Sequence, residues 1–182
     1  MKRSLILASS LFFLVSLFAS SALALDGYRD RKGLFGGGTL MGSWSKSDRT
    51  AAKSNLGLGL GLRVGGGVNS ALTVDLSIAS RSGTATEGGA DVTSTSSTMF
   101  LGANYFVNDG LYIRGMGGLA QLTNEIGPLE DSVTGLGVGV GVGYEFFGSA
   151  DLAIGVGGDF QLHTFDDESI QLMNIGVTAT WY

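Results

Sequence analysis

Apolar residues alternate with glycines over a long stretch of the chain, from Gly135 to Phe147. Every second position there is aliphatic or aromatic, and the positions between them hold five glycines and Glu145. An extended backbone puts these two sets of side chains on opposite faces, whereas a helix would mix them and would lose about 1 kcal/mol for each interior glycine. The pattern therefore predicts a β-strand with one apolar face and one nearly bare face.

Seven further segments share this period of two. Together with the first, the expected strands are 34–45, 55–64, 70–80, 95–106, 111–122, 135–147, 152–163 and 170–182. A strand face in contact with water usually carries Thr, Lys, Glu or Arg, which cover the backbone, and glycines cover nothing. The glycine faces therefore suit the narrow interior of a closed barrel, and the aliphatic faces suit lipid.

The expected connections alternate in length. Those at 46–54, 81–94 and 123–134 are long and polar, those at 65–69, 107–110 and 148–151 are tight, and the last, 164–169, is moderately long. Asn108-Asp109-Gly110 suits a tight turn because these residues tolerate a positive φ. Long loops at one end and short turns at the other are typical of outer-membrane barrels, and an even strand number then places both termini on the periplasmic side.

Aromatic residues gather near the expected strand ends. We expect the membrane interfaces to be marked by Trp44, Tyr105, Tyr144, Phe146 and Trp181. Tyr and Trp favour such interfaces because part of the ring is apolar and part can form hydrogen bonds. A general preference of aromatic residues for strand ends would explain some of this distribution.

The N-terminal segment has the features of a secretory signal peptide. It begins Met1-Lys2-Arg3, continues with an apolar run from Leu5 to Phe18, and reaches an A-x-A site at Ala22-Leu23-Ala24. We expect cleavage after Ala24, a short polar leader at 25–32 and one barrel domain at 33–182. The alternative, a retained membrane anchor, is disfavoured because the run is short and interrupted by serine.

Composition narrows the class further. The chain has 182 residues, among them 31 glycines, one proline and no cysteine, and its hydrophobic fraction of 44% argues against a disordered linker. Without disulfides, an exported chain must be stabilised by hydrogen bonding and packing. The net charge of −5 and the lack of a basic patch make nucleic acid an improbable partner.

The strand pattern and the aromatic C-terminus, Thr178-Ala179-Thr180-Trp181-Tyr182, resemble the small eight-stranded outer-membrane barrels, the class that includes OmpX and the transmembrane domain of OmpA. The likeness covers nearly all of 33–182. It implies an all-β, eight-stranded antiparallel up-and-down transmembrane barrel, monomeric and without a cofactor, in a Gram-negative outer membrane. The implied partners are outer-membrane lipids and lipopolysaccharide and, during biogenesis, periplasmic chaperones and the barrel assembly machinery.

Charged and amide side chains on the glycine faces predict a polar network in the lumen, near its periplasmic end. Its members are Arg63, Asp75, Asn104, Arg114 and Glu145. Buried charges need partners, so we expect Arg63 to face Asp75 across one hairpin and Arg114 to face Glu145 across another. A filled lumen indicates a structural or surface-interaction protein. The alternative is a narrow pore for small solutes.

Catalysis is not indicated. His163, the only histidine, is the candidate general base of a hydrolase. Barrel lipid A deacylases have a local sequence similar to His-x-Ser-Asn, whereas this chain reads His163-Thr164-Phe165-Asp166. We therefore expect that the protein is not an enzyme and that His163 is an ordinary polar residue at the barrel rim. A single histidine also disfavours a transition-metal site.

The acidic runs and the glycines each suggest another binding chemistry. The acidic runs Asp166-Asp167-Glu168 and Glu130-Asp131 could bind divalent cations that bridge lipopolysaccharide phosphates, although a solvated acidic turn is the simpler interpretation. The glycines do not follow the spacing of a nucleotide-binding loop. A soluble barrel that holds an apolar ligand stays open as an alternative, and it requires the aliphatic rows to point inward.

Overall fold

The computed structural model describes residues 31–48, 55–87, 90–126, 129–149, 151–166 and 168–182. The predicted signal peptide, 1–24, lies outside these residues, and of the predicted leader, 25–32, only Arg31 and Lys32 are described. Within the described ranges there is no helix of the length and apolarity needed to cross a membrane.

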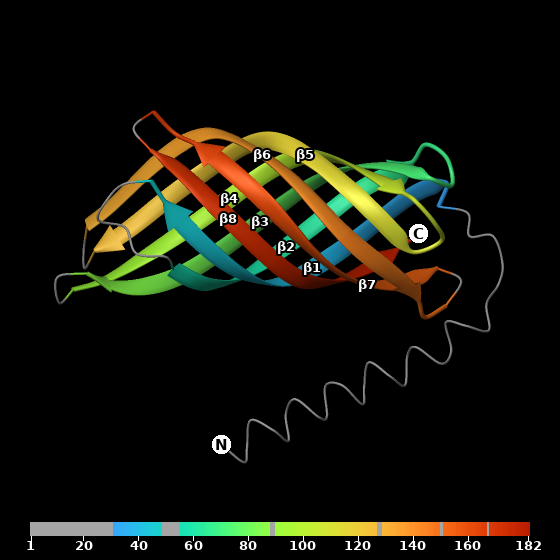
Figure 1. The fold of residues 1–182 in the computed structure, drawn as a ribbon, viewed down its shortest axis with the longest axis horizontal. Helices are drawn as coiled ribbons and strands as arrows, with labels where there is room; N and C mark the ends of the chain where they lie inside the picture. The colour runs from blue at the N-terminus through green and yellow to red at the C-terminus, as the bar shows by residue number, and fades with distance from the viewer. Residues whose placement is uncertain (1–30, 49–54, 88–89, 127–128, 150, 167) are drawn as a thin grey trace, which may run out of the picture.

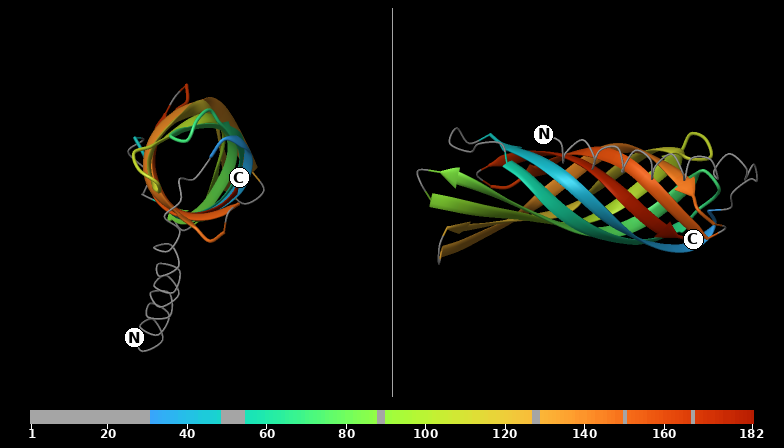
Figure 2. Two further views of the ribbon diagram at one scale, coloured as in Figure 1. Left: turned by 90° about the vertical axis from the view of Figure 1, so that its right-hand side faces the viewer. Right: turned by 90° about the horizontal axis from the view of Figure 1, so that it is seen from below.

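Eight antiparallel strands close into one barrel, in which each strand pairs with its neighbours in sequence and the last pairs with the first (Figure 1). Their bounds are β1 Gly33–Ser47, β2 Asn55–Gly67, β3 Leu72–Glu87, β4 Ala90–Phe106, β5 Leu111–Ile126, β6 Leu129–Phe147, β7 Leu152–Thr164 and β8 Ser169–Trp181. The left view of Figure 2 looks along the barrel and shows the strands enclosing a single interior. The predicted fold class is confirmed.

The strand registers set the stagger of the barrel. A path that starts at Gly33 and steps from each residue to its partner on the next strand returns to β1 at Ser43. Ser43 lies ten residues after Gly33 in the chain. Such a stagger tilts the strands, and eight strands leave an interior just wide enough for side chains to fill. Side chains from opposite walls can therefore meet.

The two faces of the strands are the ones that the alternation predicts. On β6 the valines point outward, with Val140 65% exposed, whereas Glu145 is buried inside. On β2 the leucines point outward, with Leu58 73% exposed, and the Arg63 side chain is only 9% exposed. The aliphatic rows therefore form the outer surface, which overturns the alternative of a soluble barrel with these rows inside.

The two ends of the barrel differ. At the end that we call the turn end, β2, β4 and β6 join the next strands through short connections, and the Tyr182 backbone N–H donates to the Asp151 carbonyl at 2.9 Å. At the other end, which we call the hairpin end, β3–β4 and β5–β6 form long ribbons that extend past the other strands (Figure 2, right).

The prediction of loops at 81–94 and 123–134 was wrong for most of these residues. The strands pair out to Glu87 with Ala90 in one hairpin, and to Ile126 with Leu129 in the other. These segments are rich in Thr and Ser, and threonine is well suited to strands. Their polarity reflects exposure to water and does not end the strand.

Inward glycines of β6 make room for bulky residues of β4 and β5. A Cβ atom on Gly137 would lie 2.5 Å from Cζ of Phe100, and one on Gly139 would lie 3.2 Å from Cγ of Met116. Tyr112 fills the space beside Gly143 in the same way. The bare face of β6 therefore allows large side chains to pack inside a narrow barrel.

We expect Gly137→Ala to lower the free energy of unfolding by about 1 to 3 kcal/mol, because the added methyl group overpacks against Phe100. The matched control is Gly115→Ala, since a Cβ atom there would have nothing within 4 Å. Urea unfolding in phospholipid vesicles, followed by tryptophan fluorescence, measures both. Equal effects of the two substitutions would contradict the packing argument.

Candidate functional site: the barrel interior

Glu145 is the centre of a polar cluster at the turn end of the interior. Its carboxylate accepts hydrogen bonds from Nη2 of Arg63 at 3.1 Å and from the Tyr182 hydroxyl at 2.8 Å, and it lies 3.6 Å from Nε of Arg31. Burial, and then the charge of Glu145, raise the pKa of the Tyr182 hydroxyl, which therefore stays protonated as a donor. Two guanidinium groups and a hydroxyl thus satisfy one buried carboxylate.

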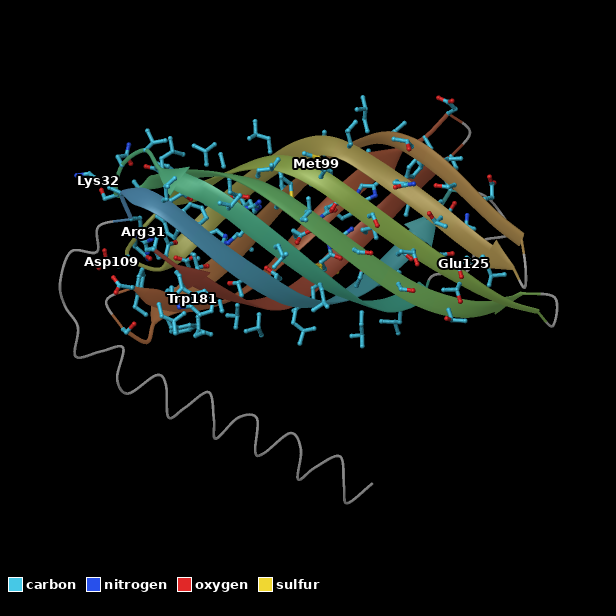
Figure 3. The ribbon with its side chains drawn as sticks, turned by 180° about the vertical axis from the view of Figure 1, so that it is seen from behind. Arg31, Lys32, Met99, Asp109, Glu125 and Trp181 are labelled. Carbon is cyan, nitrogen blue, oxygen red and sulfur yellow. The ribbon has the colours of Figure 1, made fainter. Side chains whose placement is uncertain are left out.

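Arg31 lies at the mouth of the barrel at this end. Its guanidinium donates to the backbone oxygen of Ser70 at 3.5 Å and to that of Asp109, so it joins two different turns. It also lies over the ring of Phe106, 3.7 Å from the centroid. Figure 3 labels Arg31 and Asp109 at the same end of the barrel. Arg31 was predicted to belong to the leader, because no alternation marks a residue that precedes the first strand.

A second polar cluster lies on β3, β4 and β5. Both terminal nitrogens of Arg114 donate to the two carboxylate oxygens of Asp75, at 2.6 and 2.7 Å, which is the strong bidentate arrangement. The side chain of Asn104 joins them, accepting from Arg114 at 2.9 Å and donating to Asp75 at 3.1 Å. Gly102 leaves the space for this contact, since a Cβ atom there would lie 2.5 Å from Nη2 of Arg114.

The structure places the five predicted network residues inside the barrel but exchanges the predicted ion pairs. Arg114 pairs with Asp75, and Arg63 pairs with Glu145. The predicted pairs were wrong because hairpin neighbours were assumed to face each other. The registers instead set Arg63 opposite Ser77, and Arg114 opposite Gly141. β2 and β6 lie on opposite walls, so the contact of Arg63 with Glu145 crosses the lumen.

A third polar cluster, which was not predicted from the sequence, joins β3 to β7 and β8. Nη2 of Arg81 donates to Oε1 of Gln161 at 2.9 Å. The amide groups of Gln161 and Asn174 both donate to Oδ1 of Asp159, at 2.6 and 2.7 Å. Arg81 has the same phase as Asp75 and could have been found, but the predicted strand ended one residue before it.

His163, expected as an ordinary polar residue at the barrel rim, lies one residue before the end of β7 and is buried. It is fully inaccessible, with Nε2 3.0 Å from Oε1 of Gln161 and Nδ1 3.5 Å from Oγ of Ser96. The rings of Phe100 and Phe165 meet its imidazole edge to face, with centroids 5.9 and 6.4 Å away. Phe165, which directly follows β7, is itself buried and shields His163 from solvent.

An apolar cluster lies toward the hairpin end of the interior. Its members are Ala120, Leu122, Phe165, Ile170 and Leu172. Between this cluster and the Glu145 cluster lies a cavity of about 110 Å³, which is lined in part by Tyr112, Arg81 and Asp159. The interior thus differs in chemistry between its two ends, polar at the turn end and apolar at the hairpin end.

The residues predicted at the membrane interfaces all point outward. Near the turn end, Tyr105, Tyr144 and Trp181 are 53%, 40% and 56% exposed, and Phe146 lies beside Tyr144 with ring centroids 4.6 Å apart. Trp44 pairs with Leu56 and Met173 toward the hairpin end. An interfacial role for these residues stays a prediction.

Other binding chemistry finds little support among the described residues. Within them there is no group of three or more His, Asp or Glu side chains placed to hold a metal ion. In the acidic segment at 166–168, Glu168 accepts a hydrogen bond from the Ser47 hydroxyl at 3.3 Å, and Asp167 lies outside the described residues. Cation binding there stays a prediction.

Comparison with known proteins agrees with this architecture. No curated protein sequence matches the chain significantly. Among solved structures, Neisserial surface protein A is similar with a TM-score of 0.70 at 13% identity, over 82% of this chain and 97% of that one. Ail of Yersinia pestis, in complex with the heparin analogue sucrose octasulfate, is similar with a TM-score of 0.57 at 15% identity, over 82% and 99% of the two chains.

OprG of Pseudomonas aeruginosa, an outer membrane protein, is also similar, with a TM-score of 0.50 at 11% identity over 86% of this chain and all of that one. At these identities the likeness concerns the fold alone. The sequence itself matches the model of the outer membrane protein beta-barrel domain family over residues 10–182. The chain therefore belongs to the outer membrane protein beta-barrel domain family, and it is a protein of the outer membrane.

Proposed function

We propose that this outer-membrane barrel keeps its lumen closed with its own side chains and has a structural or surface-interaction role. The single observation that carries the proposal is the Glu145 cluster. It ties together β2, β6, Tyr182 and Arg31, and Arg31 in turn reaches the turns at Ser70 and Asp109. A network that spans the lumen from several walls leaves no obvious route for solutes at the turn end.

The other two clusters and the apolar cluster support the same conclusion. Arg81 bonds to Gln161 across the lumen, from β3 to β7, and the Phe165 ring lies beyond them toward the hairpin end. Hydrogen bonds in a low-dielectric interior are stronger than in water, so each of these layers resists disruption. Solutes would have to disrupt at least two of these layers to pass.

Conductance in planar bilayers tests this proposal. We expect no large, stable openings from the wild-type protein, and we expect Glu145→Gln to produce openings, because Arg31 and Arg63 then repel each other without their shared carboxylate. The matched control is Glu125→Gln, which removes the same charge from an exposed residue. Heat-modifiable gel mobility checks that each variant is folded. Stable wild-type openings would refute the closed lumen.

A narrow pore for small solutes is the second candidate, and the cavity of about 110 Å³ is the observation that favours it. The cavity lies between the Glu145 cluster and the apolar cluster, so a pore requires both of these clusters to move. The conductance experiment separates the two functions directly, since only a pore conducts in the wild-type form.

We further propose that the barrel is not an enzyme. The candidate base, His163, is enclosed by Phe100 and Phe165 and is engaged with Gln161 and Ser96, which leaves it out of contact with lipid and solvent. A general base must lie within hydrogen-bonding reach of its substrate. The environment of His163 is that of a packed interior residue.

For assembly, we propose periplasmic chaperones and the barrel assembly machinery as partners, and the C-terminal strand as the segment that the machinery recognises. Trp181 presents its ring on the outside of the barrel, in phase with the apolar row of β8, which supports this role. Tyr182, in contrast, is engaged with Glu145. Trp181 is therefore the residue of this end that we expect the machinery to recognise.

A further inference from the structure

The ribbons at the hairpin end present a face of hydroxyl groups on the outside of four consecutive strands. The registers align Ser80, Ser97, Gln121 and Thr134 in one row across β3, β4, β5 and β6. Two residues farther along the strands, Ser82, Thr95, Thr123 and Ser132 form a second row. Beyond it, Thr84, Thr93 and Glu125 continue the pattern. We call this surface the hydroxyl face.

Hydrogen bonds between the side chains hold much of the hydroxyl face in order. The Ser97 hydroxyl donates to that of Ser80 at 3.2 Å, and the Thr95 hydroxyl donates to that of Ser82 at 3.3 Å. In the other ribbon, the amide of Gln121 donates to the Ser132 hydroxyl at 2.8 Å. Short side chains that are already oriented lose little entropy when a ligand binds.

The hydroxyl face continues directly from the outer apolar surface. The row immediately before it consists of Ile78, Met99, Leu119 and Leu136, which are aligned by the same registers and are about half exposed or more. Figure 3 shows the same order, with Met99 on the body of the barrel and Glu125 toward the hairpin end. In an outer-membrane protein the apolar row contacts acyl chains, so the hydroxyl face begins at the level of the lipid headgroups.

The composition of the hydroxyl face selects among headgroup chemistries. Its described residues include no Lys or Arg, and Glu125 would repel an anion. Phosphate recognition in proteins relies on such cations. Neutral hydroxyl and amide groups instead match the donors and acceptors of sugar hydroxyls. Rows about 6.6 Å apart on strands about 4.8 Å apart form an array wide enough for several sugar rings.

We propose that the hydroxyl face binds the saccharide of outer-leaflet glycolipids, that is, the core sugars of lipopolysaccharide. The inference rests on the outer-membrane location and on a hairpin end that faces outward, and it is independent of whether the lumen conducts. Each hydrogen bond is weak, but a glycolipid confined to the same leaflet is present at high effective concentration. The hydroxyl face would thus extend the lipid contact of the barrel into the sugar layer.

The test compares three kinds of vesicle: phospholipid alone, phospholipid with lipid A, and phospholipid with core-bearing lipopolysaccharide. Lipid A supplies the phosphates and acyl chains without the core sugars. The measured quantity is the fraction of each lipid in the vesicle that gives half-maximal stabilisation of the wild-type protein against heat. We expect this fraction to be about tenfold lower for lipopolysaccharide than for lipid A, since several hydrogen bonds contribute. Equal requirements for the two lipids would overturn the proposal.

The matched variant removes the second row of hydroxyls and retains the strand shape: Ser82→Ala, Thr95→Val, Thr123→Val and Ser132→Ala together. We expect it to respond to lipopolysaccharide and lipid A alike, whereas Thr164→Val, which removes a hydroxyl from β7, leaves the wild-type difference intact. A variant that retains the difference would also overturn the proposal. If the variant does not fold in phospholipid, competition by free core oligosaccharide decides, because it must abolish the wild-type difference.

Discussion

Asp75→Ala is expected to lower the free energy of unfolding by about 3 to 5 kcal/mol, which is the loss typical of removing one partner from a buried ion pair. The Arg114 guanidinium would then lie in the lumen without the two carboxylate oxygens that it contacts at 2.6 and 2.7 Å. Asn104 would lose the same acceptor. Urea unfolding in phospholipid vesicles measures the change, with heat-modifiable mobility as a second readout.

Two further variants separate the ion pair from general damage to the barrel. Asp131→Ala removes the same side chain from an exposed position, so its effect should stay within about 0.5 kcal/mol. Asp75→Ala combined with Arg114→Met removes both charges, and we expect it to regain much of the lost stability, because apolar groups can replace a buried pair. A double variant no more stable than Asp75→Ala would show that Asp75 does not act through Arg114.

Val140→Arg is expected to impair insertion of the barrel, at a cost of about 2 to 4 kcal/mol for a charge facing lipid near the bilayer midplane. Val140 is 65% exposed on the outside of β6, and its partners in the register are Gly115 and Phe160. An arginine there would present its charge to acyl chains, with no carboxylate on these two partners to accept it. The fraction that folds into vesicles, determined from heat-modifiable mobility, measures the effect.

The controls for Val140→Arg test its depth and its chemistry. Val140→Leu retains the apolar character and should fold as the wild type does. Val107→Arg makes the same exchange in a turn beyond the end of β4, where the cost should fall to about 0 to 1 kcal/mol. Normal assembly of Val140→Arg would mean that the outer face of β6 does not contact lipid.

Much of the interior could be predicted from the sequence because the phase of a strand is a local property. Once alternation assigns the valines of β6 to one face, Glu145 must lie on the other, and the same argument places Arg63 and Asp75 inside. The polar ribbons were harder to recognise. Their hydroxyl residues carry no apolar alternation, so the ends of β3 and β5 were predicted several residues too early.

The partners of the interior charges could not be predicted in the same way. The contact of Arg63 with Glu145 crosses the lumen, and that of Arg114 with Asp75 passes over Gly102. Both depend on how far the registers shift around the closed sheet, which no single hairpin reveals. Arg31 is the extreme case, since its position depends on the turns and rings that surround the mouth of the barrel.

The sequence by itself thus determined the number, order and direction of the strands, and which face of each looks outward, because a period of two is enforced by the backbone within each strand. Only the tertiary structure decided which charges meet, which side chains fill the space left by the glycines, and which side chains lie at the two ends of the lumen. Those contacts join residues far apart in the chain, and the stagger of the closed barrel brings them together.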